Sequence, residues 1–212
     1  MNAPNKSTLA LALLLASSVL AAQEAQVSPE ARRAAAQLAA TTCSSCHGTG
    51  GHSTSPAFPN LAAQSPAYLE AQLKAFRDQT RADPDAQAYM WGMASQLSDE
   101  MIAAIAAHYA AQSAAPGRRG DPKLVAQGKA IFEQGVPKEG IPACATCHGD
   151  HAQGNGAFPR LASQHAGYLL KQMLVIQSVL RLAPVMHGVI QNLSREQMLA
   201  VAAYLESLNA PS

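Results

Sequence analysis

The sequence is poor in aromatic and charged residues. Only 5% of its 212 residues are aromatic and 14% are charged, and 15 Lys and Arg residues offset 14 Asp and Glu residues. Without an excess of positive charge, the chain lacks the electrostatic surface that binding to nucleic acid or to an anionic membrane requires. Apolar residues still make up 48% of the chain, which disfavours disorder. Because Ala and Leu supply much of this fraction, the composition predicts a helical protein with a small core.

The apolar run near the start of the chain is too short for a typical membrane span. Residues 9–20 are predominantly apolar, whereas a spanning helix needs about 20 such residues. The run follows Lys6 and leads into small residues suited to cleavage, so it predicts a secretory signal peptide over residues 1–22. Export would place the protein in the periplasm, an oxidising compartment. An uncleaved membrane anchor is the alternative.

Cysteine is also scarce, and its placement is informative. All four cysteines occur in two motifs, Cys43-Ser44-Ser45-Cys46-His47 and Cys144-Ala145-Thr146-Cys147-His148. In an exported protein, four cysteines ordinarily suggest two disulfides. A redox-active cysteine pair and a zinc site are further alternatives, but a zinc site gives no reason for a histidine to follow each second cysteine.

Cys-x-x-Cys-His is the attachment motif of c-type haem. Two thiols bond covalently to the porphyrin edge, and the adjoining imidazole becomes an axial iron ligand. The sequence therefore predicts two covalently bound haem c groups. They would be attached through Cys43, Cys46, Cys144 and Cys147, with His47 and His148 as iron ligands.

The two motifs belong to an internal duplication. Residues 58–64 (FPNLAAQ) match residues 158–164 (FPRLASQ) at an offset of 100, whereas Leu97-Ser98 matches Leu193-Ser194 at an offset of 96. The four-residue difference is expected in the loop around Asp83-Pro84-Asp85. A linker composition near Pro116 and Gly117 separates the copies. We therefore expect a signal peptide over 1–22, a first domain over 23–115, a linker over 116–122 and a second domain over 123–212.

Each half is expected to hold about three helices and no sheet. Ser28-Pro29, Ser65-Pro66 and Ser98-Asp99 are typical helix starts. The first two helices should run into Cys43 and to about Arg77. The second half should have helices near 122–134, 166–181 and 194–208. The expected fold is all-α, with two tandem helical domains, each enclosing one covalently attached haem that fills a core otherwise too small.

The other axial ligand follows from the duplication, because a ligand needed by both haem groups should occupy matched positions. Among the histidines, only His47 and His148 match each other. Among the methionines after Met1, only Met90 and Met186 do, each expected on a loop before the last helix of its half. These two are the predicted sixth ligands. Met93 is the main alternative in the first half, and an ordinary core role is the alternative for both.

Ligation by His and Met indicates electron transfer rather than catalysis. The sulfur favours ferrous iron and raises the reduction potential, and two filled axial positions leave none for oxygen or peroxide. Pro59 and Pro159 follow the two motifs at similar distances. Their carbonyl groups are expected to accept the Nδ1 proton of each axial histidine and so orient the ring.

The motifs together resemble the dihaem cytochrome c4 family over essentially the whole mature chain. They are Cys-x-x-Cys-His-Gly, Phe-Pro-x-Leu-Ala-x-Gln, Tyr-Leu, and Met-x-Gly followed by Leu-Ser. The resemblance implies two class I cytochrome c folds related by a pseudo-two-fold axis, with haem propionates approaching across the domain interface. It also implies periplasmic electron delivery to terminal oxidases. Ala63 and Ser163 stand where this family often has Gly.

The expected function is thus a periplasmic electron carrier, not an enzyme. Its partners would be redox proteins that dock transiently, such as a terminal oxidase or a dehydrogenase, with no small-molecule substrate and no nucleic acid. The alternative is the cytochrome subunit of a dehydrogenase complex that oxidises sulfur compounds or alcohols. A dihaem peroxidase is disfavoured, because it needs one haem that can open a coordination position.

Overall fold

The computed structural model describes residues 27–209, so the predicted signal peptide over 1–22 lies outside the described residues. Within this range the chain forms helices and loops, with two isolated β-bridges and no strand. The predicted all-α class is confirmed for the described part of the chain. None of the helices there combines the length and hydropathy of a membrane span.

The first half contains five α-helices and three short turns of other helix types. Ser28, Ser65 and Ser98 cap the three longest helices as predicted, each side chain accepting a hydrogen bond from a backbone N–H of the first turn. The elements are α2 (Pro29–Leu38), the π-helical turn η1 (Ala39–Cys43), α3 (Ser44–His47), the 3₁₀ turn η2 (Thr49–Gly51), α4 (Pro66–Arg77), the π-helical turn η3 (Ala86–Met90), α5 (Trp91–Ala94) and α6 (Asp99–Ala110).

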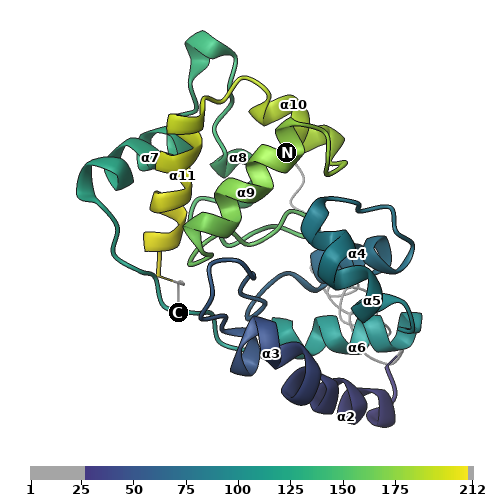
Figure 1. Ribbon diagram of the computed structural model, residues 1–212. Coiled ribbons are helices and arrows are strands. Elements are labelled where there is room, and N and C mark those ends of the chain that lie inside the picture. Colours follow the sequence, from purple (N-terminus) through teal and green to yellow (C-terminus); the bar gives the residue numbers. More distant parts are fainter. Residues whose placement is uncertain (1–26, 210–212) are drawn as a thin grey trace, which may run out of the picture.

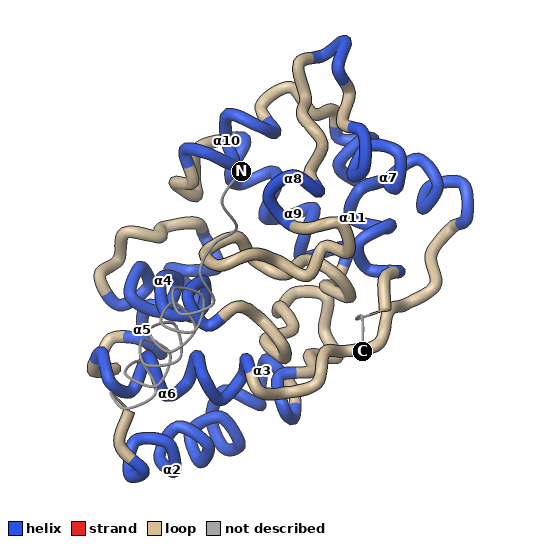
Figure 2. Tube along the Cα trace, turned by 180° about the vertical axis from the view of Figure 1, so that it is seen from behind, coloured by secondary structure: helices blue, strands red, loops and turns tan. Residues whose placement is uncertain are grey.

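The second half repeats this plan. Asp121 caps its first helix, and Ser194 and Gln197 form a capping box at the start of its last one. The elements are α7 (Pro122–Gln134), the 3₁₀ turn η4 (Pro137–Glu139), α8 (Ala145–His148), α9 (Ala166–Gln177), α10 (Pro184–Ile190) and α11 (Arg195–Ser207). The two halves form separate sides of the molecule, and loops of both lie between them (Figures 1 and 2).

The predicted helix over 166–181 is too long. It ends at Gln177, because Val179 adopts the left-handed conformation with φ of 62°. The N–H of Val179 donates to the carbonyl of Ile176 at 3.0 Å, which closes the last turn. The chain then turns back towards the other half of the molecule.

The expectation that both predicted methionine ligands lie on loops is also wrong. Met90 is the last residue of η3, and Met186 lies within α10. A proline begins α10, since Pro184 has the φ value that a first helical residue needs. The four additional residues of the first half lengthen the corresponding segment, which forms η3 and α5 in place of one helix.

The core of each half lies where its first and last long helices cross. In the first half this core is largely alanine, and Ala35 and Ala106 are fully buried. In the second half, α7 and α11 approach so closely that a Cβ on Gly128 would lie 1.9 Å from the carbonyl oxygen of Ala200. The crossing therefore depends on the absence of a side chain at Gly128.

Replacing Gly128 with Ala should destabilise the second domain. The added methyl group would meet backbone atoms of α11, and overpacking of this kind costs about 1–3 kcal/mol. Urea unfolding of the holoprotein, followed by circular dichroism, measures the change. Gly188→Ala is the matched control, because nothing lies within 4 Å of a Cβ at Gly188. An equal effect of both substitutions would contradict the close helix crossing.

Candidate functional site

Both Cys-x-x-Cys-His motifs line one cavity of about 1000 Å³ between the two halves. Each motif forms the short helix, α3 or α8, that the chain enters after its first long helix. The four cysteines are half-buried and free, so the disulfide alternative does not describe this structure. The cavity lies at the upper end of the range of about 300–1,000 Å³ for ligand sites.

The motif histidines occupy equivalent positions at the ends of α3 and α8. His47 and His148 are buried, and each places its Nδ1 3.0 Å from a backbone carbonyl oxygen, that of Pro59 and Pro159 respectively. A carbonyl only accepts, so Nδ1 carries the proton and Nε2 keeps its lone pair for a metal. The predicted orienting role of the two proline carbonyls is confirmed.

The electrostatics of the motif favour ligation over thiol chemistry. Burial lowers the pKa of both His47 and His148, and the hydrogen bond to the proline carbonyl only partly offsets it, which keeps the rings neutral as a metal ligand must be. Burial raises the pKa of the Cys144 thiol to about 11 and also raises the pKa of Cys43. A redox-active cysteine pair needs a lowered thiol pKa, so this alternative is disfavoured.

Met90 and Met186 also line the cavity. Met90 is half-buried against the small cluster of Phe76, Ala86 and Ala94, and Met186 packs against the core of the second half. Met93 lines the same cavity, but this residue is 58% exposed. This placement favours Met90 over Met93 as the buried sulfur of the first half.

The backbone conformation of Ala63 and Ser163 explains why these two positions suit glycine. Both adopt the left-handed conformation, with φ of 56° and 59°. The Ala63 N–H donates to the carbonyl of Tyr109 at 2.9 Å, and that of Ser163 to the carbonyl of Leu205 at 2.8 Å. These bonds hold the loop after each proline onto the last helix of its half, so the departure from glycine leaves the loop geometry intact.

Two glutamines join the halves at the cavity by reciprocal hydrogen bonds. Gln164 accepts from the backbone N–H of Asn60 at 2.8 Å and donates to its carbonyl at 3.0 Å. Gln64 makes the same two bonds to Arg160, at 2.7 and 3.0 Å. All four of these residues are buried. The matched positions thus recognise each other across a pseudo-two-fold axis.

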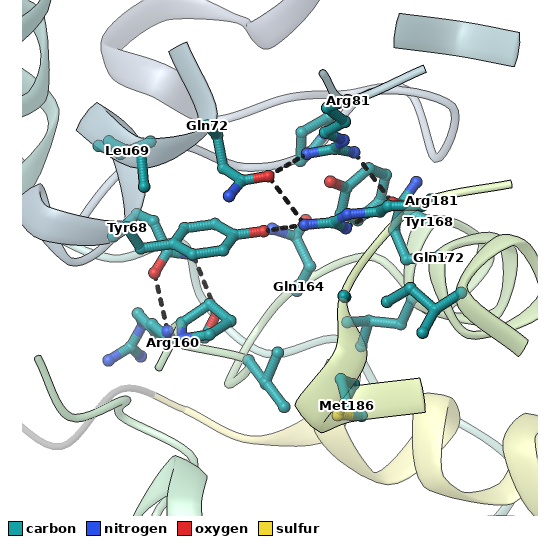
Figure 3. Close-up of a pocket in the computed structure, with 18 of the residues that line it drawn as sticks. Tyr68, Leu69, Gln72, Arg81, Arg160, Gln164, Tyr168, Gln172, Arg181 and Met186 are labelled. Atoms are coloured by element: carbon teal, nitrogen blue, oxygen red, sulfur yellow. Dashed lines mark hydrogen bonds between the residues drawn. The ribbon is translucent and has the colours of Figure 1, made fainter. Parts of the chain in front are cut away.

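Sequence reasoning missed a set of buried arginines beside the cavity. Arg81, Arg160 and Arg181 are each 8% exposed, whereas Asp83 is the one buried carboxylate among the described residues. All four line the cavity, and Figure 3 shows the three arginines around it. In the sequence, Arg81 matches Arg181 at the offset of 100, and this match could have indicated that both positions matter.

The donor set fits haem c. Buried charges are ordinarily paired. Arg81 pairs with Asp83 at 2.9 Å, whereas the carboxylates that haem bears would supply negative charge near Arg160 and Arg181. The free thiols and the neutral histidines, with the thioethers nearby, supply the groups that covalent attachment and iron ligation need.

Comparisons with known proteins agree with this assignment of haem c to both halves. The cytochrome c family profile matches residues 33–110 and 125–209. The chain belongs to the cytochrome c family. It is 44% identical over 168 residues to cytochrome c-552 of Acidithiobacillus ferridurans, covering 78% of this chain and 73% of that protein. It is 37% identical over 182 residues to cytochrome c4 of Pseudomonas aeruginosa, covering 83% and 88% of the two chains.

The cytochrome c4 structure of Acidithiobacillus ferrooxidans is similar throughout its length, with a TM-score of 0.75, 42% identity and coverage of 78% of this chain and 98% of that chain. A thiosulfate dehydrogenase electron acceptor of Thiomonas intermedia is 35% identical over 179 residues, or 81% of either chain. The protein is accordingly a cytochrome c4-like electron-transfer protein, not an enzyme, with two tandem cytochrome c domains and a covalently bound haem c in each.

Replacing Gln64 with Leu should loosen the junction of the two domains of this cytochrome. The N–H and carbonyl of Arg160 would lose their partners, and a buried unsatisfied group costs about 1–3 kcal/mol. We expect the free energy of unfolding to fall by at least about 2 kcal/mol in urea titrations. Gln127→Leu, at an exposed position of α7, is the control, and an equal loss there would contradict the role of Gln64.

Proposed function

We propose that this cytochrome is a periplasmic electron carrier with one His/Met-ligated iron in each domain. Its metal ligands are His47 and Met90 in the first domain, and His148 and Met186 in the second. The thiols of Cys43, Cys46, Cys144 and Cys147 attach the two haem groups. The predicted domains over 23–115 and 123–212, with the linker over 116–122 and the signal peptide over 1–22, complete the proposal.

The observation that carries this proposal is the matched placement of the two donor sets. In each half a buried histidine with a fixed Nδ1–H and a half-buried methionine line the same cavity. A neutral imidazole and a thioether from these residues would hold a haem iron in each domain, favour its ferrous state, and leave no position for oxygen or peroxide. Such an iron exchanges electrons and does not activate small molecules.

Replacing Met90 with Ala should open the iron of the first domain to added ligands such as imidazole and lower its reduction potential. The physical reason is the loss of a sulfur ligand that prefers ferrous iron. Optical titration with imidazole and a redox titration measure both effects. Met93→Ala is the matched control, because its side chain is largely exposed. Loss of the sulfur ligand in Met93→Ala and its retention in Met90→Ala would reverse the assignment.

The acceptor that we propose is a membrane terminal oxidase, which docks transiently. A second candidate is a dehydrogenase partner, with this chain as its electron acceptor or its cytochrome subunit. Two relatives named thiosulfate dehydrogenase electron acceptor favour it, one 35% identical over 179 residues and the other 47% identical over 88 residues, or 41% of this chain. A thiosulfate dehydrogenase structure, TsdBA from Marichromatium purpuratum, also matches with a TM-score of 0.72 and 32% identity, covering 84% of this chain and 40% of that chain.

Turnover of the purified holoprotein with membranes of its source distinguishes the two candidates. We expect reoxidation of the reduced cytochrome to require the oxidase and to stop when an oxidase inhibitor is added. Reduction of the oxidised cytochrome by dehydrogenase fractions supplied with thiosulfate, and co-purification at fixed stoichiometry, would instead support a complex subunit. Failure of membranes to reoxidise the protein would contradict the oxidase assignment.

A further inference from the structure

Large apolar side chains are exposed on the connection between α9 and α10 in the second domain. Four residues there are each more than half exposed, Val179, Leu180, Leu182 and Val185. Among the described residues, the core cluster of the second half includes the neighbouring Met186 but none of these four. We call the four residues the apolar patch. The α9–α10 connection lies on the side of the second domain away from α7 (Figures 1 and 2).

The two domains build this connection with the same backbone. Gln79 and Val179 both adopt the left-handed conformation, with φ of 57° and 62°. Two residues further on, the N–H of Arg81 donates to a carbonyl in the last turn of α4, and that of Arg181 to a carbonyl in the last turn of α9. The turn after α4 is therefore the structural counterpart of the turn after α9.

The side chains on this shared backbone differ between the domains. At the offset of 100, three residues of the apolar patch correspond to polar or small residues, namely Val179 to Gln79, Leu180 to Thr80, and Leu182 to Ala82. The first domain thus forms the same turn beside the same cavity without large apolar side chains. Neither the fold nor the enclosure of a haem therefore requires them. A β-branched residue such as Val179 is even strained in the left-handed region.

The apolar patch carries no exposed charge. Arg181 is the one charged residue of segment 179–186, and it is 8% exposed. Its guanidinium group donates to side chains of both domains inside the interface. His187, which follows the segment, is half-buried, with Nδ1 3.0 Å from the carbonyl oxygen of Ile176. A surface that complements the patch is therefore uncharged as well, because a charged group would lose its hydration there without gaining an opposite charge.

The size of the apolar patch fits a transient partner better than a second copy of the chain. Its exposed fractions correspond to about 400 Å², within the range of about 300–600 Å² for the largest patch on a monomer, which is often functional. A stable complex buries about 800 Å² on each partner, whereas encounters between redox proteins bury less.

A lipid surface matches the patch poorly. Segment 178–190 contains no Lys, Trp or Tyr, and its one arginine is buried. Proteins that rest on a membrane use such residues to hold their apolar groups at the interface. The composition around the patch therefore favours a protein partner.

The apolar patch extends from the cavity to the outer surface. Leu182 and Val185 line the cavity, and Met186, the iron ligand that we propose for the second domain, follows Val185 directly. Val179 and Leu180 continue the patch along the α9–α10 connection. A protein seated on this patch is therefore close to the haem site of the second domain, as electron exchange requires.

We propose that the apolar patch is the surface on which the second domain docks its redox partner, a protein with an uncharged apolar face that binds transiently. The inference rests on the proposed electron-carrier function and adds where the partner binds. Burial of apolar surface supplies the affinity. Association should therefore depend little on salt, unlike docking between charged surfaces.

A variant that carries the residues of the first domain tests the patch in the holoprotein. In Val179→Gln/Leu180→Thr/Leu182→Ala, each new residue is one that the same backbone already carries in the first domain, so the fold should be retained. With membranes of the source, the KM for the reduced cytochrome should rise at least about fivefold at unchanged saturating turnover, because interface contacts are lost. The KM of the unmodified protein should change less than about twofold between low and high salt.

An exposed apolar residue outside the patch provides the matched control. Leu199 of α11 is 38% exposed, and Leu199→Gln should leave the KM unchanged. The same comparison is made for reduction of the oxidised cytochrome by dehydrogenase fractions. The methionine ligation signature of each variant shows whether both iron sites are intact.

An apolar electrode tests the patch without a biological partner. On gold coated with a methyl-terminated alkanethiol, the unmodified holoprotein should adsorb and give a voltammetric signal. The triple variant should give a signal at least about fivefold weaker, because it lacks the apolar contact. A hydroxyl-terminated coating is the control, on which the two proteins should not differ.

Equal KM values for the unmodified protein and the triple variant, with membranes and with dehydrogenase fractions, would overturn the inference, as would equal signals on the methyl coating. Dimers in analytical ultracentrifugation, or binding to phosphatidylcholine vesicles, would also overturn it if the triple variant abolished them. The patch would then belong to a second copy or to a lipid surface. Absence of turnover with either source, with a patch-dependent electrode signal, would contradict the proposed partners and not the docking surface.

Discussion

The same backbone segment orients each motif histidine and joins the two domains. The carbonyl of Pro59 holds His47, and the next residue, Asn60, is held by Gln164 of the other domain. The second domain repeats this arrangement with Gln64 at Arg160. Because the bonded groups are buried, separating the domains would leave orphan polar groups that cost free energy. The ring orientation at each site is therefore tied to the packing of the whole molecule.

The two domains share one backbone plan, apart from the four additional residues of the first half, so most other differences between them lie in individual side chains. The helix order, the carbonyl that orients each histidine and the glutamine contacts are shared by both halves. The charges at the cavity differ between the domains. Asp83 corresponds to Ala183 of the second domain, and Arg160 corresponds to Asn60 of the first. In an interior of low dielectric constant, each such substitution acts more strongly than the same substitution at an exposed position, where solvent and salt screen the charge.

Left-handed residues recur where the two domains are shaped to meet. Ala63 and Ser163 fasten the interface loops to the last helices, and Gln79 and Val179 turn the chain back after α4 and α9. None of these positions is a glycine, so each departs from the residue that suits its conformation best. Backbone hydrogen bonds on both sides of each turn hold the conformation in place.

The sequence by itself determined the helical class, the duplication and the caps at Ser28, Ser65 and Ser98, because these features depend on composition and on residues close together in the chain. It also indicated which proline carbonyls orient His47 and His148, since matched spacing repeats that local geometry. The end of α9 was decided by a turn at Val179, whose left-handed conformation has no sequence signature of its own. Met90 and Met186 lie in η3 and α10, short helices where the sequence pattern predicted loops. Only the tertiary structure brought Arg81, Asp83, Arg160 and Arg181 to one cavity, because burial and pairing of charges depend on how two distant parts of the chain pack together.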